Sequence, residues 1–126
     1  MKVRTKVWIE DDHGKVVFGA GREHMLEAID RLGSMNKAAK ALKMYYRALW
    51  ARIKSTEDRL GAKLVTTRPG GGKASGTSLT PTGKRFLKSF KLLEDSVHQR
   101  ADKEFDKIFR DTKIDEKQSL PRDAMN

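Results

Sequence analysis

The side chains whose chemistry is most informative are three neighbours, Tyr45, Tyr46 and Arg47, with Lys54 two helical turns further along the chain. An arginine guanidinium can form two hydrogen bonds with the edge of guanine, and a tyrosine hydroxyl can bond to a phosphate. The order of these residues predicts a cationic and aromatic cluster at the leading end of a helix. We therefore interpret them as contacts to the major groove of double-stranded DNA.

Individual residues in this cluster leave alternatives open. Arg47 is the best candidate for reading a base, and a phosphate contact is its alternative. For Tyr46 we expect a DNA contact, and packing against its own domain is the alternative. Trp50 stands at helical spacing from Ile53, so we expect it in the core rather than on DNA.

The positive charge of the chain is concentrated in one block. The 126 residues carry a net charge of +10, and residues 43–93 alone hold 12 basic and 2 acidic side chains. Residues 1–42 hold 8 basic and 6 acidic side chains, and residues 94–126 hold 7 and 9. A basic block between nearly neutral segments is typical of a surface that binds a polyanion, rather than of general solubilising charge.

Residues 33–61 have the pattern of a helix-turn-helix. Ser34 is a suitable N-cap for a short helix, and residues 42–44 form a tight turn before a second helix that ends near Leu60, with Gly61 as its stop. The short helix has small side chains that let the second helix cross it closely, namely Ala38, Ala39 and Ala41. An ordinary helical hairpin is the alternative.

A second β-hairpin is predicted directly after that helix, from residues 63–68 and 75–79. Its tip holds three consecutive glycines at 70–72, which let a backbone approach closely, while Arg68 and Lys73 supply cations for phosphates or the minor groove. This geometry predicts the wing of a winged helix, and a flexible connection is the alternative. The tip lacks the Gly-x-x-x-x-Gly-Lys-Ser/Thr spacing of a nucleotide-binding loop.

Two further elements flank this region. Apolar runs around residues 3–9 and 15–18, joined by turn residues, predict an N-terminal β-hairpin, and a helix over 22–32 follows it. Beyond residue 83 a long helix carries apolar residues at steps of three and four, namely Phe86, Phe90, Leu93, Val97, Ala101, Phe105 and Ile108. Because soluble monomers avoid exposing such a stripe, we expect it to pair with its twin in a homodimer. Folding back on its own domain is the alternative.

The residues do not indicate catalysis, metal or cofactor binding, or membrane insertion. The chain has no cysteine, which excludes disulfides and thiolate metal sites, and His13, His24 and His98 are too widely spaced to form a metal site. No nucleophile motif, paired carboxylates or cofactor fingerprint is present, so we expect no catalytic residue, no metal and no cofactor. The sequence also has no signal peptide and no apolar run of membrane-spanning length, which predicts a cytoplasmic protein without a membrane partner.

Roughly residues 5–92 resemble a known family. The matching runs are VWIEDDHGKVVFGAGREHMLEAIDRLGSMNKAAKALKMYYRALWARI and RLGAKLVTTRPGGGKASGTSLTPTGKRFL. The most characteristic parts of the first run are its opening strand and turn, its alanine-rich helix and its Met-x-Tyr-Arg sequence with Trp50. The most characteristic part of the second run is its Gly-rich wing. They resemble the N-terminal DNA-binding domain of the ModE-type molybdate-responsive regulators, and more distantly the winged helix of LysR-type regulators.

The resemblance implies a recognition helix led by Tyr45, Tyr46 and Arg47, with a wing that carries Arg68 and Lys73. It also implies that Ser34, Asn36 and Lys37 lie near the phosphates. We expect Lys43, in the turn after the short helix, to join them there. Three positions depart from the family, which usually has a small residue at Tyr45, often a polar one at Ala48 and a smaller one at Leu49. The preferred operator is therefore expected to differ from that of the family.

The prediction is thus an α+β, mainly helical chain. Residues 1–82 form a winged helix-turn-helix with an N-terminal β-hairpin, 83–110 a long dimerisation helix, and 111–126 a polar tail that is disordered or loosely attached. Full-length regulators of the resembled type carry C-terminal molybdate-binding domains, and 34 residues follow residue 92, so molybdate binding is not expected.

The expected function is sequence-specific transcriptional regulation, with a dimer bound to a palindromic or pseudo-palindromic operator. Two rival functions use the same sequence features. One is a nonspecific architectural DNA-binding protein, which would share the basic face. The other is a winged-helix module that binds a protein.

Overall fold

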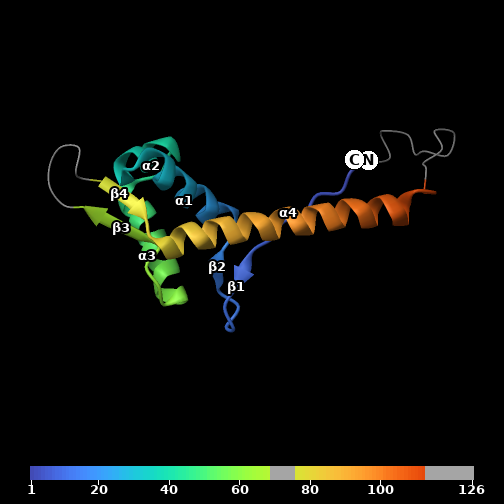
Figure 1. Cartoon of the computed structure of the whole chain (residues 1–126), viewed down its shortest axis with the longest axis horizontal. Helices are drawn as coiled ribbons and strands as arrows, with labels where there is room; N and C mark the ends of the chain where they lie inside the picture. The colour runs from blue at the N-terminus through green and yellow to red at the C-terminus, as the bar shows by residue number, and fades with distance from the viewer. Residues whose placement is uncertain (69–75, 113–126) are drawn as a thin grey trace, which may run out of the picture.

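A computed structural model gives the fold and describes residues 1–68 and 76–112. The elements follow in the predicted order of hairpin, three helices, second hairpin and long helix (Figure 1). Their bounds are β1 Ile9–Glu10, β2 Val16–Phe18, α1 Ala20–Leu32, α2 Met35–Ala41, α3 Tyr46–Leu60, β3 Val65–Arg68, β4 Gly76–Leu79 and α4 Pro81–Phe109. The predicted fold class, a mainly helical winged helix-turn-helix with two small antiparallel sheets, is confirmed.

The N-terminal hairpin is closed by one aspartate. The Asp11 carboxylate accepts hydrogen bonds from the backbone N–H groups of His13 and Lys15, each at 2.9 Å. The bond from Lys15 is the main cause that lowers the pKa of Asp11. Gly14 completes the turn with a φ of +80°, which few other residues adopt readily. The hairpin then delivers Phe18, which is fully buried, to the core.

The helix ends of the central region follow the signals read from the sequence. Gly33 ends α1 with a φ of +66° and donates its N–H to the carbonyl of Ile29. The hydroxyl of Ser34 caps α2 by accepting from the N–H of Lys37 at 3.2 Å. Gly61 ends α3 in the left-handed conformation, with a φ of +69°.

The core is built around an aromatic contact between the N-terminal hairpin and the start of α4. The ring of Phe18 lies 4.8 Å from that of Phe86 and 4.9 Å from that of Phe90, measured between centroids. Phe90 is 1% exposed, so its assignment to a dimer interface is wrong, because its own chain encloses it. Phe86 packs against the same core. Phe86 and Phe90 therefore fold back on their own domain, which was the alternative to a dimer interface.

Beyond Phe90, α4 leaves the domain. Figure 1 shows its later turns extending away from the other helices, with the N-terminal segment beside them. Leu93, Val97 and Ile108 are 42%, 36% and 65% exposed. Since the first turns of α4 lie in the core, the expected boundary between residues 82 and 83 falls inside a continuous helix. The expected tail at 111–126 lies outside the described residues from 113 onward.

Gly83 sets how closely α4 approaches the wing, and it yields a stability prediction. A Cβ added there would lie 2.2 Å from the carbonyl oxygen of Leu64, a backbone atom that cannot swing aside. Gly83→Ala should therefore lower the free energy of unfolding by about 3 kcal/mol in urea denaturation. Gly21→Ala is the matched control, because its Cβ meets open space within α1, and it should raise stability by about 0.5 kcal/mol. Equal stability of the two variants would contradict the packing described.

Candidate nucleic-acid interface

The helix-turn-helix depends on a close crossing of α2 and α3. Ala38 and Ala39 are 0% and 3% exposed, so their small side chains form the contact surface of α2. The N–H of Met44 donates to the carbonyl of Ala39 at 2.9 Å, which closes the turn. Lys43 holds the turn in the left-handed region, with a φ of +56° that is uncommon for a side chain of this size. This turn places Tyr45 as the N-cap of α3.

The two faces of α3 differ as its sequence predicts. Leu49 and Ile53 are fully buried on the inner face. On the outer face, Tyr45 is 86% exposed, and Arg47 and Lys54 are exposed too. Lys54 forms an ion pair with Asp58 at 3.4 Å, one turn further along the helix. The leading end of α3 therefore presents an aromatic side chain and a guanidinium to solvent.

Trp50 connects the core to this exposed end. Its indole is half-buried and packs against the core, and it meets the ring of Tyr46 edge-on at 6.3 Å. Tyr46 is 46% exposed. One side of the Tyr46 ring is thus supported by its own domain while the rest remains accessible. The packing alternative therefore holds for part of the ring, and the DNA contact stays a prediction.

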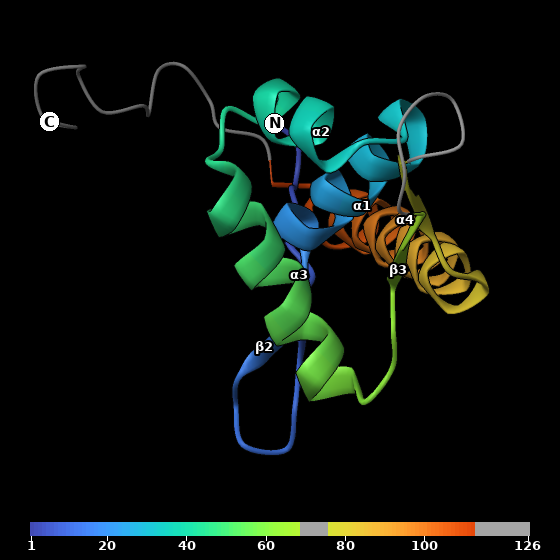
Figure 2. The ribbon, with the colours of Figure 1, turned by 90° about the vertical axis from the view of Figure 1, so that its left-hand side faces the viewer.

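A pocket of about 210 Å³ joins the three elements expected to contact nucleic acid. Its lining residues come from the start of α2, from α3 and from both wing strands: Ser34, Met35, Asn36, Tyr46, Trp50, Thr67, Arg68, Gly76 and Thr77. Figure 2 shows α3 in front, with α2 above it and β3 to one side. The pocket places Tyr46 of α3 and Arg68 of the wing on one surface.

The wing is fixed to the helices on both of its strands. On β3, the carboxylate of Glu57, which is 5% exposed, accepts from the N–H groups of Leu64 and Val65 at 2.7 and 3.2 Å. On β4, the N–H of Thr77 donates to the carbonyl of Gly33 at 3.0 Å. The strands pair antiparallel, with Val65 opposite Leu79 and Arg68 opposite Gly76. The described part of the wing is therefore held against α1 and α3.

The remaining candidates divide into three cases. Asn36, Lys37 and Lys43 are exposed near the start and the end of α2. The hydroxyl of Ser34 serves the helix as its cap, so its polar group already has a partner. Lys73 lies outside the described residues, and its place in the wing tip stays a prediction.

Glu57 is the structural residue that the sequence analysis did not single out. Its signal is present in the sequence: an acidic residue stands between Ile53 and Leu60, on the inward stripe of an amphipathic helix. A carboxylate at such a position needs hydrogen-bond donors, because burying it without them is costly. Only the fold shows that the donors are two backbone N–H groups at the start of the wing.

Within residues 1–68 and 76–112, no three side chains of the metal-ligating types His, Cys, Asp and Glu gather closely enough to hold a metal ion. In the same residues no helix has both the length and the apolar character needed to cross a membrane. The described surface carries exposed cations at the start of α2, on α3 and on β3.

Comparison with known proteins gives a family match and partial relatives. Residues 23–84 match the model of the bacterial regulatory helix-turn-helix proteins of the lysR family. The molybdenum-pterin-binding protein MopB of Rhodobacter capsulatus is 35% identical over 79 residues, which are 63% of this chain and 29% of MopB. The molybdenum transport protein ModE of Azotobacter vinelandii is 38% identical over 73 residues, 58% of this chain and 27% of ModE. The chain thus spans less than a third of each relative.

A solved structure agrees with the fold. The LysR family transcriptional regulator CbnR superimposes with a TM-score of 0.50 over 68% of this chain and 28% of CbnR. The two sequences are 22% identical in that region, so the likeness concerns the fold. It agrees with the winged arrangement of helices and strands described above.

The buried carboxylate of Glu57 yields a second prediction. Glu57→Ala leaves the N–H groups of Leu64 and Val65 without their acceptor, and should lower the free energy of unfolding by about 3 kcal/mol. Lys63→Ala is the control, because it removes only the exposed partner of a 3.7 Å ion pair with Glu57 and should cost less than about 0.5 kcal/mol. Amide hydrogen exchange at Val65 should accelerate in Glu57→Ala alone. Unchanged exchange there would mean that the carboxylate does not hold the wing.

Proposed function

We propose that this chain is a transcriptional regulator that binds specific sites on double-stranded DNA, through the part of it, residues 23–84, that matches the bacterial regulatory helix-turn-helix proteins of the lysR family. The observation that carries the proposal is the shared pocket of Tyr46, Asn36 and Arg68. A recognition helix, a neighbouring helix end and a wing meet there on one exposed, cationic surface. A duplex groove and its two flanking phosphate strands have the complementary shape and charge.

In the proposed complex the leading end of α3 enters the major groove. Arg47 forms paired hydrogen bonds with a guanine, a contact worth about 1–3 kcal/mol of discrimination between bases. Tyr45 contacts the adjoining bases or backbone, and Tyr46, supported by Trp50, contacts the sugar-phosphate strand that borders the pocket. Lys54 lies further along the exposed face and adds positive charge beside the groove.

The phosphate strands are held on either side of α3. Asn36, Lys37 and Lys43 stand at the ends of α2, and Ser34 keeps the first of these ends in place as its cap. Arg68, with Lys73 from the wing tip, contacts the strand on the other side. Contacts of this kind set the register of the protein on DNA, while the bases supply the specificity.

A dimer through α4 completes the proposal. Phe90 is enclosed by its own chain, so the proposed seam begins at Leu93 and continues through the exposed or half-exposed residues Val97, Phe105 and Ile108. Phe105 stacks on Phe109 at 5.0 Å, which adds a second aromatic ring at the end of the helix. Two-fold pairing of this stripe presents two recognition helices, and these fit a palindromic or pseudo-palindromic operator.

The proposed partners are DNA and a second copy of the chain, and the proposed place of action is the cytoplasm, where bacterial DNA lies. The names of the relatives refer to molybdenum, but no molybdate site is proposed in the described residues. Their strands form two separate two-stranded sheets, and neither sheet closes into a barrel around an anion. No catalytic role is proposed for any residue of the surface.

Replacing one cation at a time tests the DNA contacts. Arg47→Ala should reduce discrimination between the preferred duplex and a mutated one by about tenfold, because it removes a base contact. Lys73→Ala should weaken both duplexes equally and lower the log–log salt slope by about 0.9, as expected for one phosphate contact. Fluorescence anisotropy over a range of salt concentrations measures both effects. An equal loss for all duplexes in both variants would exclude base reading by Arg47.

Charge placed on the exposed stripe tests the dimer. Leu93→Glu should convert the dimer to a monomer in analytical ultracentrifugation without loss of stability, because Leu93 is already 42% exposed within one chain. Gln99→Glu, on the opposite face of α4, adds the same charge and should leave the dimer intact. If both variants remained dimeric, the seam would lie elsewhere.

A further inference from the structure

We propose that Arg22 of α1 and Arg52 of α3 together bind a backbone phosphate of DNA, on the flank of α3 that faces away from the wing. The inference rests on the proposed function, because the phosphate belongs to the duplex whose groove receives the leading end of α3. It adds a phosphate site to those proposed at the ends of α2 and on the wing. The start of α1 then borders the duplex on one side of α3, as the wing does on the other.

The contacts of α3 distinguish its two flanks. Trp50 lines the pocket shared with Arg68, and the Glu57 carboxylate binds the start of the wing, so this flank faces the wing. Successive residues of a helix are about 100° apart, so Arg52 points about 160° away from Trp50 around the helix axis. Thr56, one turn after Arg52, contacts α1 instead of the wing. Arg52 therefore lies on the flank that faces the start of α1.

Thr56 brings the two arginines together. Its hydroxyl is fully buried, accepts from Arg22 Nε at 3.4 Å and donates to the carbonyl oxygen of Arg52 at 2.9 Å. Arg22 is half-buried there, and its pKa is lowered first by that burial and then by the positive charge of Arg52. Two like charges held close together cost free energy, and an anion between them removes that cost.

The arginine pair keeps hydrogen-bond donors for an external acceptor. Within residues 1–68 and 76–112, no carboxylate forms an ion pair with Arg22 or Arg52. In the same residues, Arg22 donates through Nε alone, so its two terminal amino groups have no acceptor. An arginine side chain has five N–H donors in a planar fork, and phosphate oxygens fit this fork in pairs.

A pocket beside Arg22 leaves room for the sugar–phosphate backbone. It measures about 390 Å³, and its lining includes Lys6, Trp8, Val16 and Arg22. Among the described residues that line it, two are cations and none is acidic. The Trp8 side chain is 51% exposed, so a deoxyribose can pack on the indole while its phosphate lies against the guanidinium.

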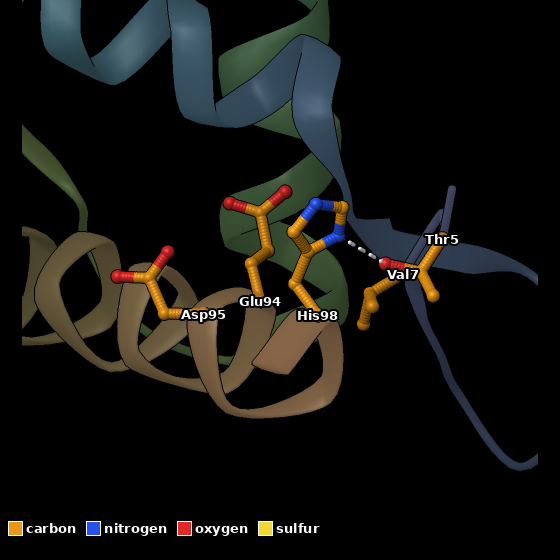
Figure 3. A pocket seen from close by; sticks show the side chains of 5 residues that line it. All are labelled: Thr5, Val7, Glu94, Asp95 and His98. Carbon is orange, nitrogen blue, oxygen red and sulfur yellow. Dashed lines mark hydrogen bonds between the residues drawn. The ribbon is translucent and has the colours of Figure 1, made fainter. Parts of the chain in front are cut away.

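A second pocket shows the opposite charge. Figure 3 shows a pocket of about 260 Å³ between the N-terminal segment and α4, where Glu94 and Asp95 stand beside His98. His98 Nδ1 already shares a hydrogen bond of 2.8 Å with the hydroxyl of Thr5. Two carboxylates in such a pocket repel a phosphate, so the cationic pocket at Arg22 is the one that suits DNA.

Arg59 continues the row of arginines on this flank but does not belong to the proposed site. Its guanidinium donates to the carbonyl oxygen of Val16. After the hydrogen bond from Lys15, which is the main cause, its charge also contributes to the lowered pKa of Asp11 in the hairpin turn. Arg59 is therefore engaged within its own chain, which limits the proposed site to the arginine pair.

Continuity with the leading end of α3 identifies the anion as part of DNA. Tyr45 and Arg52 are seven residues apart, so they lie on the same flank about 10 Å from each other along the helix. Tyr45 is 86% exposed and Arg52 is exposed as well. A duplex that receives Tyr45 in its groove thus brings a bordering strand within reach of Arg52.

The salt dependence of duplex binding by the full chain tests the site. Arg22→Gln and Arg52→Gln should each lower affinity about tenfold at low salt, for preferred and mutated duplexes alike. Each should also lower the log–log salt slope by about 0.9. Arg100→Gln is the matched control, because it removes the same charge from the later turns of α4, where Arg100 pairs with Glu104. It should leave affinity and slope unchanged, and Arg52→Lys should keep the slope.

Replacement of single phosphates by uncharged methylphosphonates locates the contact. One position of the preferred duplex should weaken wild-type binding about tenfold and weaken Arg52→Gln no further, because that variant has already lost the contact. The same position should still weaken Arg68→Ala about tenfold, since the proposed contact of Arg68 lies on the other side of α3.

The other outcomes have distinct meanings. Unchanged affinity and slope in both Arg→Gln variants would overturn the inference and leave the proposed function standing. Weaker binding with an unchanged slope and a lower stability in urea would overturn it in favour of a structural role. Binding of inorganic phosphate that Arg22→Gln abolishes, with DNA binding unchanged, would assign the pocket to a free anion. Failure of wild type to retain any duplex at low salt would reject the proposed function itself.

Discussion

The buried carboxylate of Glu57 is the interaction on which the arrangement of the proposed DNA-binding surface depends. Arg47 and Tyr46 belong to α3, whereas Arg68 belongs to a wing that begins only after the helix has ended at Gly61. Two backbone N–H groups at the start of the wing bind the Glu57 carboxylate inside the fold, so the wing cannot shift without breaking buried hydrogen bonds. Helix and wing therefore present their cations as one surface.

The helix α4 links this surface to the proposed dimer because its first turns lie in the core of the domain and its later turns are exposed. Its first turns pack against Leu64 through Gly83, and against Phe18 through Phe90, so they are part of the domain. Its later turns are exposed and carry the apolar stripe. In the proposed dimer, the spacing of the two copies of α3 would be set through this one continuous helix.

Periodicity and turn chemistry predicted most of the fold, because they report on local structure. The ends of α1 and α3 at Gly33 and Gly61 and the cap at Ser34 follow from single residues. Local patterns do not predict which other part of the chain covers an apolar helix face. The stripe of α4 is regular from Phe86 onward, yet its start is covered by Phe18, a residue far away in sequence. Glu57 escaped notice because its partners come from another element.

The most direct test of this account is selection of duplexes from a random pool by the full chain, followed by sequencing. Paired recognition helices predict an enriched motif with two-fold symmetry, whose half-sites lie about one helical turn apart. Guanine should be prominent in each half-site if Arg47 reads a base. A bound pool without any enriched sequence would contradict the account, because the surface of α3 and the wing would then bind phosphates alone.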